Sequence, residues 1–234
     1  ARLRKLQPHI IINNRSAMPE DFDTPEGHIH ASDRDWETCN TLTRLGWGYI
    51  DEEQSAPFAI SSKQILRDLH LCTCGGGNLL LNIAPAPDGS IPKDTVDRLL
   101  PVGEWLKING VATYGQKFRT GPVYSANTLT AVSADKDLKT FYLWNWVWPK
   151  NGKLIFGGYL DFPKKISFLA TGEEIKFRVD GHRIILEDLP AEVPDKITGV
   201  TALKMEFENA PRHIFRSYYP QMHLGHDFSD GGAR

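Results

Sequence analysis

Seven acidic residues lie between positions 20 and 37, and aromatic and basic residues are interleaved with them or flank them. A carboxyl group can donate a proton to a departing group while a second carboxylate assists at the reacting carbon, which is the chemistry of glycoside hydrolysis. Aromatic faces and fixed polar groups are what a protein uses to bind a sugar. By composition alone, however, such a loop is more often simply solvated. The acidic residues are Glu20, Asp21, Asp23, Glu26, Asp33, Asp35 and Glu37, and the others are Arg15, Phe22, His28, His30, Trp36, Trp47 and Tyr49.

The composition excludes several classes of protein. The chain has 234 residues, is 41% hydrophobic and 24% charged, and carries a net charge of −2, so nothing indicates binding to nucleic acid or to an anionic membrane. No apolar run reaches the roughly 18–20 residues that span a bilayer. The three cysteines, Cys39, Cys72 and Cys74, fit neither a disulfide framework nor a zinc site, and we expect buried thiols at Cys72 and Cys74.

A buried strand is the first predicted element of the fold that holds these side chains. Three glycines precede the apolar run Asn78–Ile83, which predicts a strand buried on both faces, as in a parallel sheet. Asn82 lies near its carboxyl end, where α/β barrels collect polar groups for ligands. The alternative is a core strand whose Asn is satisfied by the backbone. Ile10–Ile12 predicts a second buried strand, and because it directly follows an apparent helix end, we expect the N-terminal part of a barrel to be absent.

Helical signals surround the Asn78–Ile83 strand. We expect a short helix through Trp36–Leu45, and a second helix that starts from the capping box formed by Ser61 and Gln64. Pro92 suits the first turn of a third helix. Pro101 should kink or divide that helix, because proline removes a backbone donor.

Beyond about residue 117 the pattern changes to short β-rich runs separated by Asn-Gly, Thr-Gly and Asp-Gly turns. This predicts antiparallel hairpins that form a sandwich, with a boundary between Tyr114 and Pro122 and a polar tail from Gln221. Trp144, Trp146 and Trp148 alternate, so a strand would place all three on one face. They could form a carbohydrate-binding platform or pack the sandwich against the preceding domain. The runs are Lys139–Asn145, Lys153–Phe156, Lys165–Leu169, Ile175–Val179 and Arg183–Leu186.

Five sequence blocks, in order, resemble the catalytic domain of family 29 glycoside hydrolases, the α-L-fucosidases. The resemblance implies an α/β fold, the second half of a (β/α)8-like barrel over residues 1–118, followed by an antiparallel β-sandwich over residues 119–234. The downstream segment FYLWNWVWPKNGKLIF is similar to the sandwich of the same family. The blocks are QPHIIINNR, DFDTPEGHIH, DWETCNTLTRLGWGY, GGGNLLLN and GEWLKINGVATYG, at residues 7–15, 21–30, 35–49, 75–82 and 103–115.

The resemblance also implies an activity and the residues for it. Family members are retaining exo-glycosidases that hydrolyse terminal α-L-fucosyl linkages without a metal or other cofactor. The family's nucleophilic Asp lies on a strand upstream of residues 7–15, so it is expected outside this chain. Glu26 matches the acid/base, and Glu37 is the alternative. Arg15 matches an arginine that contacts the substrate, or else forms a salt bridge to a loop acid; Trp47 matches an aromatic against the apolar side of fucose, or else is a core residue.

A fucosylated glycan is thus the partner that the resemblance implies, and a secreted, periplasmic or lysosomal location suits such a substrate. Two other classes of function compete with the enzyme. The first is a non-catalytic carbohydrate-binding remnant that keeps sugar-recognition residues without a nucleophile. The second is a structural or interaction module dominated by the β-sandwich.

Overall fold

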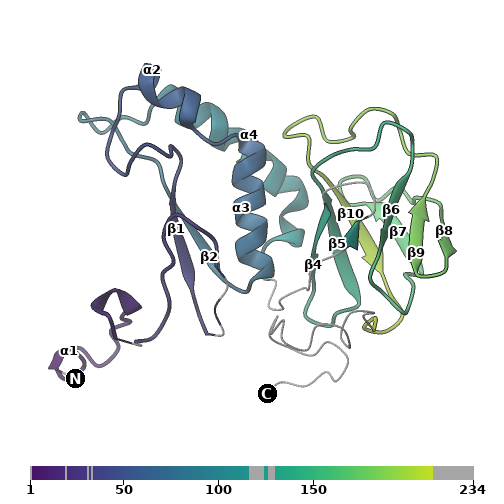
Figure 1. Cartoon of the computed structure of the whole chain (residues 1–234), viewed down its shortest axis with the longest axis horizontal. Coiled ribbons are helices and arrows are strands. Elements are labelled where there is room, and N and C mark those ends of the chain that lie inside the picture. The colour runs from purple at the N-terminus through teal and green to yellow at the C-terminus, as the bar shows by residue number, and fades with distance from the viewer. Residues whose placement is uncertain are drawn as a thin grey trace.

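The computed structural model describes residues 2–18, 20–30, 32, 34–115, 124–125 and 130–212. A mixed α/β part is followed along the longest axis by two antiparallel sheets (Figure 1). The predicted boundary between residues 118 and 119 and the predicted polar tail from Gln221 lie outside the described residues. Helices of the first part are α1 (Arg2–Leu6), α2 (Glu52–Ser55), α3 (Ser62–Cys74) and α4 (Lys93–Asn109), with 3-10 turns η1 (Asn14–Ser16), η2 (Ala56–Phe58) and η3 (Gly110–Ala112).

Strands β1 (Glu37–Thr41) and β2 (Asn78–Asn82) pair in parallel, with Thr41 opposite Asn82. Single parallel bridges extend this pairing outward from β1: Glu26 bridges to Cys39, Asp23 to Trp36, and Asn13 to Phe22. Four backbone segments therefore run side by side in the same direction. The helix expected over Trp36–Leu45 is wrong, because residues 37–41 pair with β2 as a strand, and Trp36, Thr38 and Leu42, which share one face of it, are buried.

Two burial predictions for this parallel part are also wrong. Residues Ile10–Ile12 form no strand, since their stretch makes only the single bridge at Asn13, and Ile11 is 74% exposed. The β2 strand is covered on one face only. Leu80, which points away from α3 and α4, is 45% exposed because no described segment packs on that side.

Helices α3 and α4 cover the other face of the parallel strands. The predicted cap of α3 is confirmed, since the Ser61 Oγ accepts a hydrogen bond from the Gln64 backbone N–H at 3.2 Å. Helix α4 begins after Pro92 and continues for 17 residues through Pro101, so Pro101 does not divide it. Burial of Val102 and Trp105 directly after the proline stabilises the helix there. No helix within the described ranges is long and apolar enough to cross a membrane.

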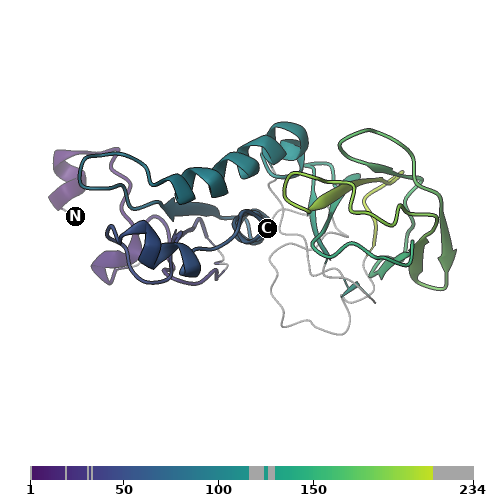
Figure 2. The same cartoon turned by 90° about the horizontal axis from the view of Figure 1, so that it is seen from above.

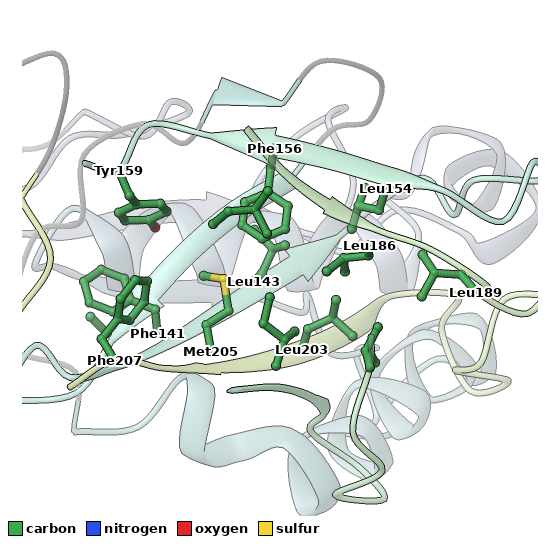
Figure 3. Packing of buried hydrophobic residues seen from close by; sticks show 14 of the residues in the cluster. Phe141, Leu143, Leu154, Phe156, Tyr159, Leu186, Leu189, Leu203, Met205 and Phe207 are labelled. Carbon is green, nitrogen blue, oxygen red and sulfur yellow. The ribbon is translucent and has the colours of Figure 1, made fainter. Parts of the chain in front are cut away.

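The second part consists of two four-stranded antiparallel sheets, in the orders β4-β5-β10-β7 and β3-β6-β9-β8. Their facing side chains form one hydrophobic cluster, with Phe141, Leu143 and Leu203 from one sheet against Phe156 and Leu186 from the other (Figure 3). The five predicted β-runs are strands, but among them only β8 and β9 form a hairpin with each other, because the other successive runs belong to different sheets. The bounds of the strands in the two sheets are β3 (Tyr124–Ser125), β4 (Thr130–Ala134), β5 (Thr140–Asn145), β6 (Leu154–Gly157), β7 (Lys165–Phe168), β8 (Phe177–Asp180), β9 (Arg183–Leu186) and β10 (Thr201–Glu206).

The two parts share a second hydrophobic cluster. Helix α4 runs toward the sheets (Figure 2), and its Trp105 lies 4.6 Å, between ring centroids, from Trp144 of β5. The Trp105 Nε1 donates to the Val200 carbonyl at 2.7 Å. Trp146 belongs to the same cluster, so Trp144 and Trp146 both pack the two parts of the chain against each other. Trp148 differs because β5 ends at Asn145: it packs against the cluster between the sheets.

Candidate functional site

The turn η1 and the segment after Phe22 place Arg15 and Glu26 next to each other. The Arg15 Nη1 donates to Glu26 Oε2 at 2.5 Å, and the Arg15 Nε donates to the Thr24 hydroxyl at 3.1 Å. The hydrogen bond to Glu26 is the main cause that raises the pKa of Arg15, with a smaller contribution from the nearby Cys39 thiol. The salt bridge to a loop acid, one of the two interpretations of Arg15, is thus present, and the acid is Glu26.

The Arg15–Glu26 pair is open to solvent, with side-chain exposures of 45% and 43%. Ion pairs this exposed contribute little to stability, because water and salt screen them. Stability alone therefore gives little reason for the pair, and both groups remain accessible to a ligand. They lie on the face of the parallel strands that carries Cys39, Thr41 and Asn82, opposite the face covered by α3 and α4.

Asn14 fixes the orientation of this pair through Thr24. Its Nδ2 donates to the Asp23 carboxylate at 3.0 Å, so its Oδ1 is the acceptor for the Thr24 backbone N–H at 3.1 Å and the Thr24 hydroxyl at 2.9 Å. With its own proton directed to Asn14, the Thr24 hydroxyl can only accept from Arg15. Asn14 and Thr24 were not among the predicted site residues, although both lie inside the blocks that carry the family resemblance.

Trp47 is not a core residue, because it is 43% exposed. It lies in the loop after β1, at the carboxyl ends of the parallel strands. The Asn82 Nδ2 donates to the Trp47 carbonyl at 2.8 Å and to the Thr41 hydroxyl at 3.2 Å. The prediction that Asn82 lies at the carboxyl end of a strand is confirmed, and its amide bonds to both the backbone and a side chain.

Glu37 lies at the opposite end of β1. As the first residue of the strand it is about 13 Å from Thr41, since a strand rises about 3.3 Å per residue. Glu26 lies beside Cys39 of the same strand, and Cys39 is only about 7 Å along the strand from Thr41. Among the described residues, the Glu37 carboxylate has no hydrogen-bond or ion-pair partner. The structure thus brings Glu26 and Arg15 together and leaves Glu37 apart.

Other loop acids stabilise the fold of the loop. Asp21 accepts from the Ile12 N–H and from Arg4, both at 2.8 Å. Asp23 accepts from Arg34, Ser32 and Asn14, and these donors, with Arg34 first, lower its pKa to about 2. Asp33 lies outside the described residues. No group of three or more potential metal ligands occurs in the part of the chain that the structure describes.

Comparison with known proteins identifies the family. The sequence profile described as alpha-L-fucosidase matches residues 1–111. Mouse tissue alpha-L-fucosidase is 33% identical over 180 residues, covering 75% of this chain and 37% of the mouse protein. The chain belongs to the α-L-fucosidase family. Human tissue alpha-L-fucosidase is 30% identical over 167 residues, covering 70% of this chain and 35% of the human protein.

Solved α-L-fucosidase structures share the fold. The crystal structure of the Thermotoga maritima alpha-fucosidase matches with a TM-score of 0.71 at 24% identity, over 87% of this chain and 47% of that chain. The chain therefore spans a little over a third of the length of the first curated relatives and about half of this solved structure. Arg15, Glu26, Trp47 and Asn82 all fall within the segment that the α-L-fucosidase profile matches.

Proposed function

We propose that this chain is the acid/base-bearing part of a retaining α-L-fucosidase, which hydrolyses terminal α-L-fucosyl linkages of fucosylated glycans. In this proposal, residues 1–118 form the second half of a (β/α)8-like barrel and residues 119–234 form a β-sandwich. Family membership and the four parallel backbone segments, with helices on one face, support it. The nucleophilic Asp belongs to a strand outside residues 1–234.

The observation that carries the proposal is the solvent-accessible pair of Arg15 and Glu26 on the uncovered face of the parallel strands. In parallel α/β folds, ligands bind at the carboxyl ends of the strands. Glu26 would protonate the glycosidic oxygen while the nucleophilic Asp attacks the anomeric carbon and forms a glycosyl ester. Glu26 would then take a proton from the water that cleaves the ester, which releases fucose with its original α configuration.

Arg15 and Trp47 have supporting roles in this proposal. Arg15 would release or share its contact with Glu26 when a fucosyl hydroxyl enters, because the guanidinium has several donors. The exposed indole of Trp47 would pack against the apolar side of fucose, including its methyl group. Glu37 is the alternative acid/base, but its place at the start of β1 supports Glu26 instead.

The test is hydrolysis by the full-length gene product that contains these residues. We expect release of the aryl group from an aryl α-L-fucoside, with α-fucose as the first product seen by proton NMR, and no hydrolysis of the matched β-L-fucoside. Binding of fucose without turnover would favour the non-catalytic carbohydrate-binding protein. Absence of both binding and turnover would favour the structural module, and β-fucose as first product would exclude a retaining mechanism.

A further inference from the structure

Two hydrogen bonds attach the Trp47 loop to the carboxyl ends of β1 and β2. The Asn82 Nδ2 donates to the Trp47 carbonyl at 2.8 Å, and the Thr41 hydroxyl donates to the Gly46 carbonyl at 3.2 Å. The hydroxyl must be the donor in the second bond because a carbonyl can only accept, and the same hydroxyl accepts from the Asn82 Nδ2 at 3.2 Å. Two successive carbonyls of the loop are thus held by donors from paired positions of two neighbouring strands.

The Trp47 loop needs such anchors because of its sequence. Trp47 stands between Gly46 and Gly48, and glycine leaves the backbone free to adopt many conformations. Its side chain is 43% exposed and belongs to neither hydrophobic cluster of the described residues. Packing of the ring therefore does little to set its direction, and the backbone anchors must do so.

We infer that Asn82 and Thr41 are positioning residues for Trp47, which orient the indole to receive the apolar side of the sugar. This inference rests on the proposed function. It also assigns a role to Asn82 of the GGGNLLLN block that a satisfied core asparagine would not have. An aromatic surface whose orientation is set before the ligand arrives loses less conformational entropy on binding, and this raises the affinity.

Asn82→Asp is the sharpest variant, because it keeps the size of the side chain and removes the donor to the Trp47 carbonyl. Thr41→Val removes the second donor while keeping a β-branched residue in the strand, and Thr41→Ser restores a hydroxyl as its matched control. In the full-length enzyme, with an aryl α-L-fucoside, we expect Asn82→Asp and Thr41→Val each to raise KM about 10-fold, with a smaller change in kcat. Thr41→Ser should stay near the parent enzyme.

A double-mutant cycle with Trp47→Ala separates positioning from a merely structural role. If Asn82 acts through Trp47, the double variant Asn82→Asp, Trp47→Ala should have the KM of Trp47→Ala alone. Additive effects, in which the two fold-changes multiply, would overturn the inference while leaving the proposed function intact. If Trp47→Ala itself leaves KM unchanged in an active enzyme, the proposed role of Trp47 fails and the inference fails with it.

A readout independent of turnover guards against variants that fold poorly. Intrinsic fluorescence should change on addition of L-fucose in the parent enzyme and change less in Thr41→Val, with thermal melting midpoints that match. The same fluorescence change in Thr41→Val as in Thr41→Ser would overturn the role of Thr41. A lowered melting midpoint in Thr41→Val together with an unchanged KM would likewise count against positioning.

Discussion

Carboxylates of the 20–37 segment differ in how many fixed donors they accept from. Asp23 accepts from three side chains, led by Arg34, and its pKa is lowered to about 2, so it stays ionised at any pH near neutrality. Glu26 accepts from Arg15 and remains exposed. The Glu26 carboxylate is therefore accessible to a ligand, whereas the Asp23 carboxylate is occupied by three donors within the loop.

Replacing Glu26 should separate proton transfer from the rest of catalysis. In the full-length enzyme, Glu26→Ala should slow hydrolysis of natural fucosides by about 100-fold or more, and of an activated aryl fucoside much less, because a good leaving group departs without protonation. Azide should restore turnover of the activated substrate and yield α-fucosyl azide, because it attacks the glycosyl ester in place of water and so retains the original configuration. Glu37→Ala is the matched control. Azide rescue of Glu37→Ala, with none for Glu26→Ala, would reverse the assignment.

At the scale of elements, the turn between α3 and β2 is set by contact with Trp36. The Trp36 Nε1 donates to the Gly75 carbonyl at 3.0 Å, and a Cβ at Gly77 would come within 2.2 Å of the Trp36 ring. The ring is buried and cannot move aside without displacing its neighbours. Gly77 is therefore needed for the close approach of the Trp36 ring, which comes from a distant part of the chain.

Gly77→Ala should lower the free energy of unfolding by about 1–3 kcal/mol, because it overpacks the site beside Trp36. Gly103→Ala is the matched control: it lies inside α4 with nothing within 4 Å of its added Cβ. Alanine there should stabilise the helix by about 0.5–1 kcal/mol. Urea unfolding of both variants measures the difference, and equal effects in the two would contradict this account of the turn.

For the molecule as a whole, the contact of α3 and α4 with β5 and β10 joins two parts that each have their own sheet. Trp105 and Trp144 are fully buried at this junction, and His70 of α3 lies against Trp144 with ring centroids 4.5 Å apart. The junction is a continuous hydrophobic cluster. Two parts joined in this way should unfold together.

Removing the central indole should uncouple them. Trp105→Ala deletes a fully buried ring and the donor to the Val200 carbonyl, at a cost of about 3–5 kcal/mol. Scanning calorimetry should then show two transitions in place of one. Trp47→Ala, at an exposed tryptophan, should leave the melting profile nearly unchanged. A single unshifted transition in Trp105→Ala would show that the junction does not couple the parts.

The junction should also weaken in acid because of His70. Burial lowers the pKa of His70 from 6.5 to about 3, so the folded state keeps it neutral. Because the pKa of His70 is lower in the folded state than in the unfolded state, the buried neutral ring contributes to stability above about pH 6.5. That contribution is lost as the pH falls from about 6.5 toward 3, where the unfolded state binds a proton and the folded state does not. His70→Gln should flatten the dependence of melting temperature on pH in this range. His28→Gln, at an exposed histidine, should not; an unchanged slope in His70→Gln would contradict the prediction.

Features that depend on near neighbours in the chain can be predicted from the amino-acid sequence. The cap at Ser61 and the β-runs between Gly-containing turns follow from interactions over a few residues, and the structure has them where they were predicted. The ordered blocks predicted the family, which the comparisons confirm. Glu26, Arg15 and Trp47 were named as candidates from the same blocks.

Tertiary structure decided what depends on pairing between distant segments. A helix is predicted over Trp36–Leu45, yet pairing with β2 makes residues 37–41 a strand, while the predicted strand over Ile10–Ile12 does not form. Only the fold could show that Arg15 meets Glu26 and not Glu37, or that Asn82 reaches the Trp47 carbonyl 35 residues away. The physical reason is that parallel strands pair across long connections, and the residues close to a strand in the sequence do not show which distant segment will pair with it.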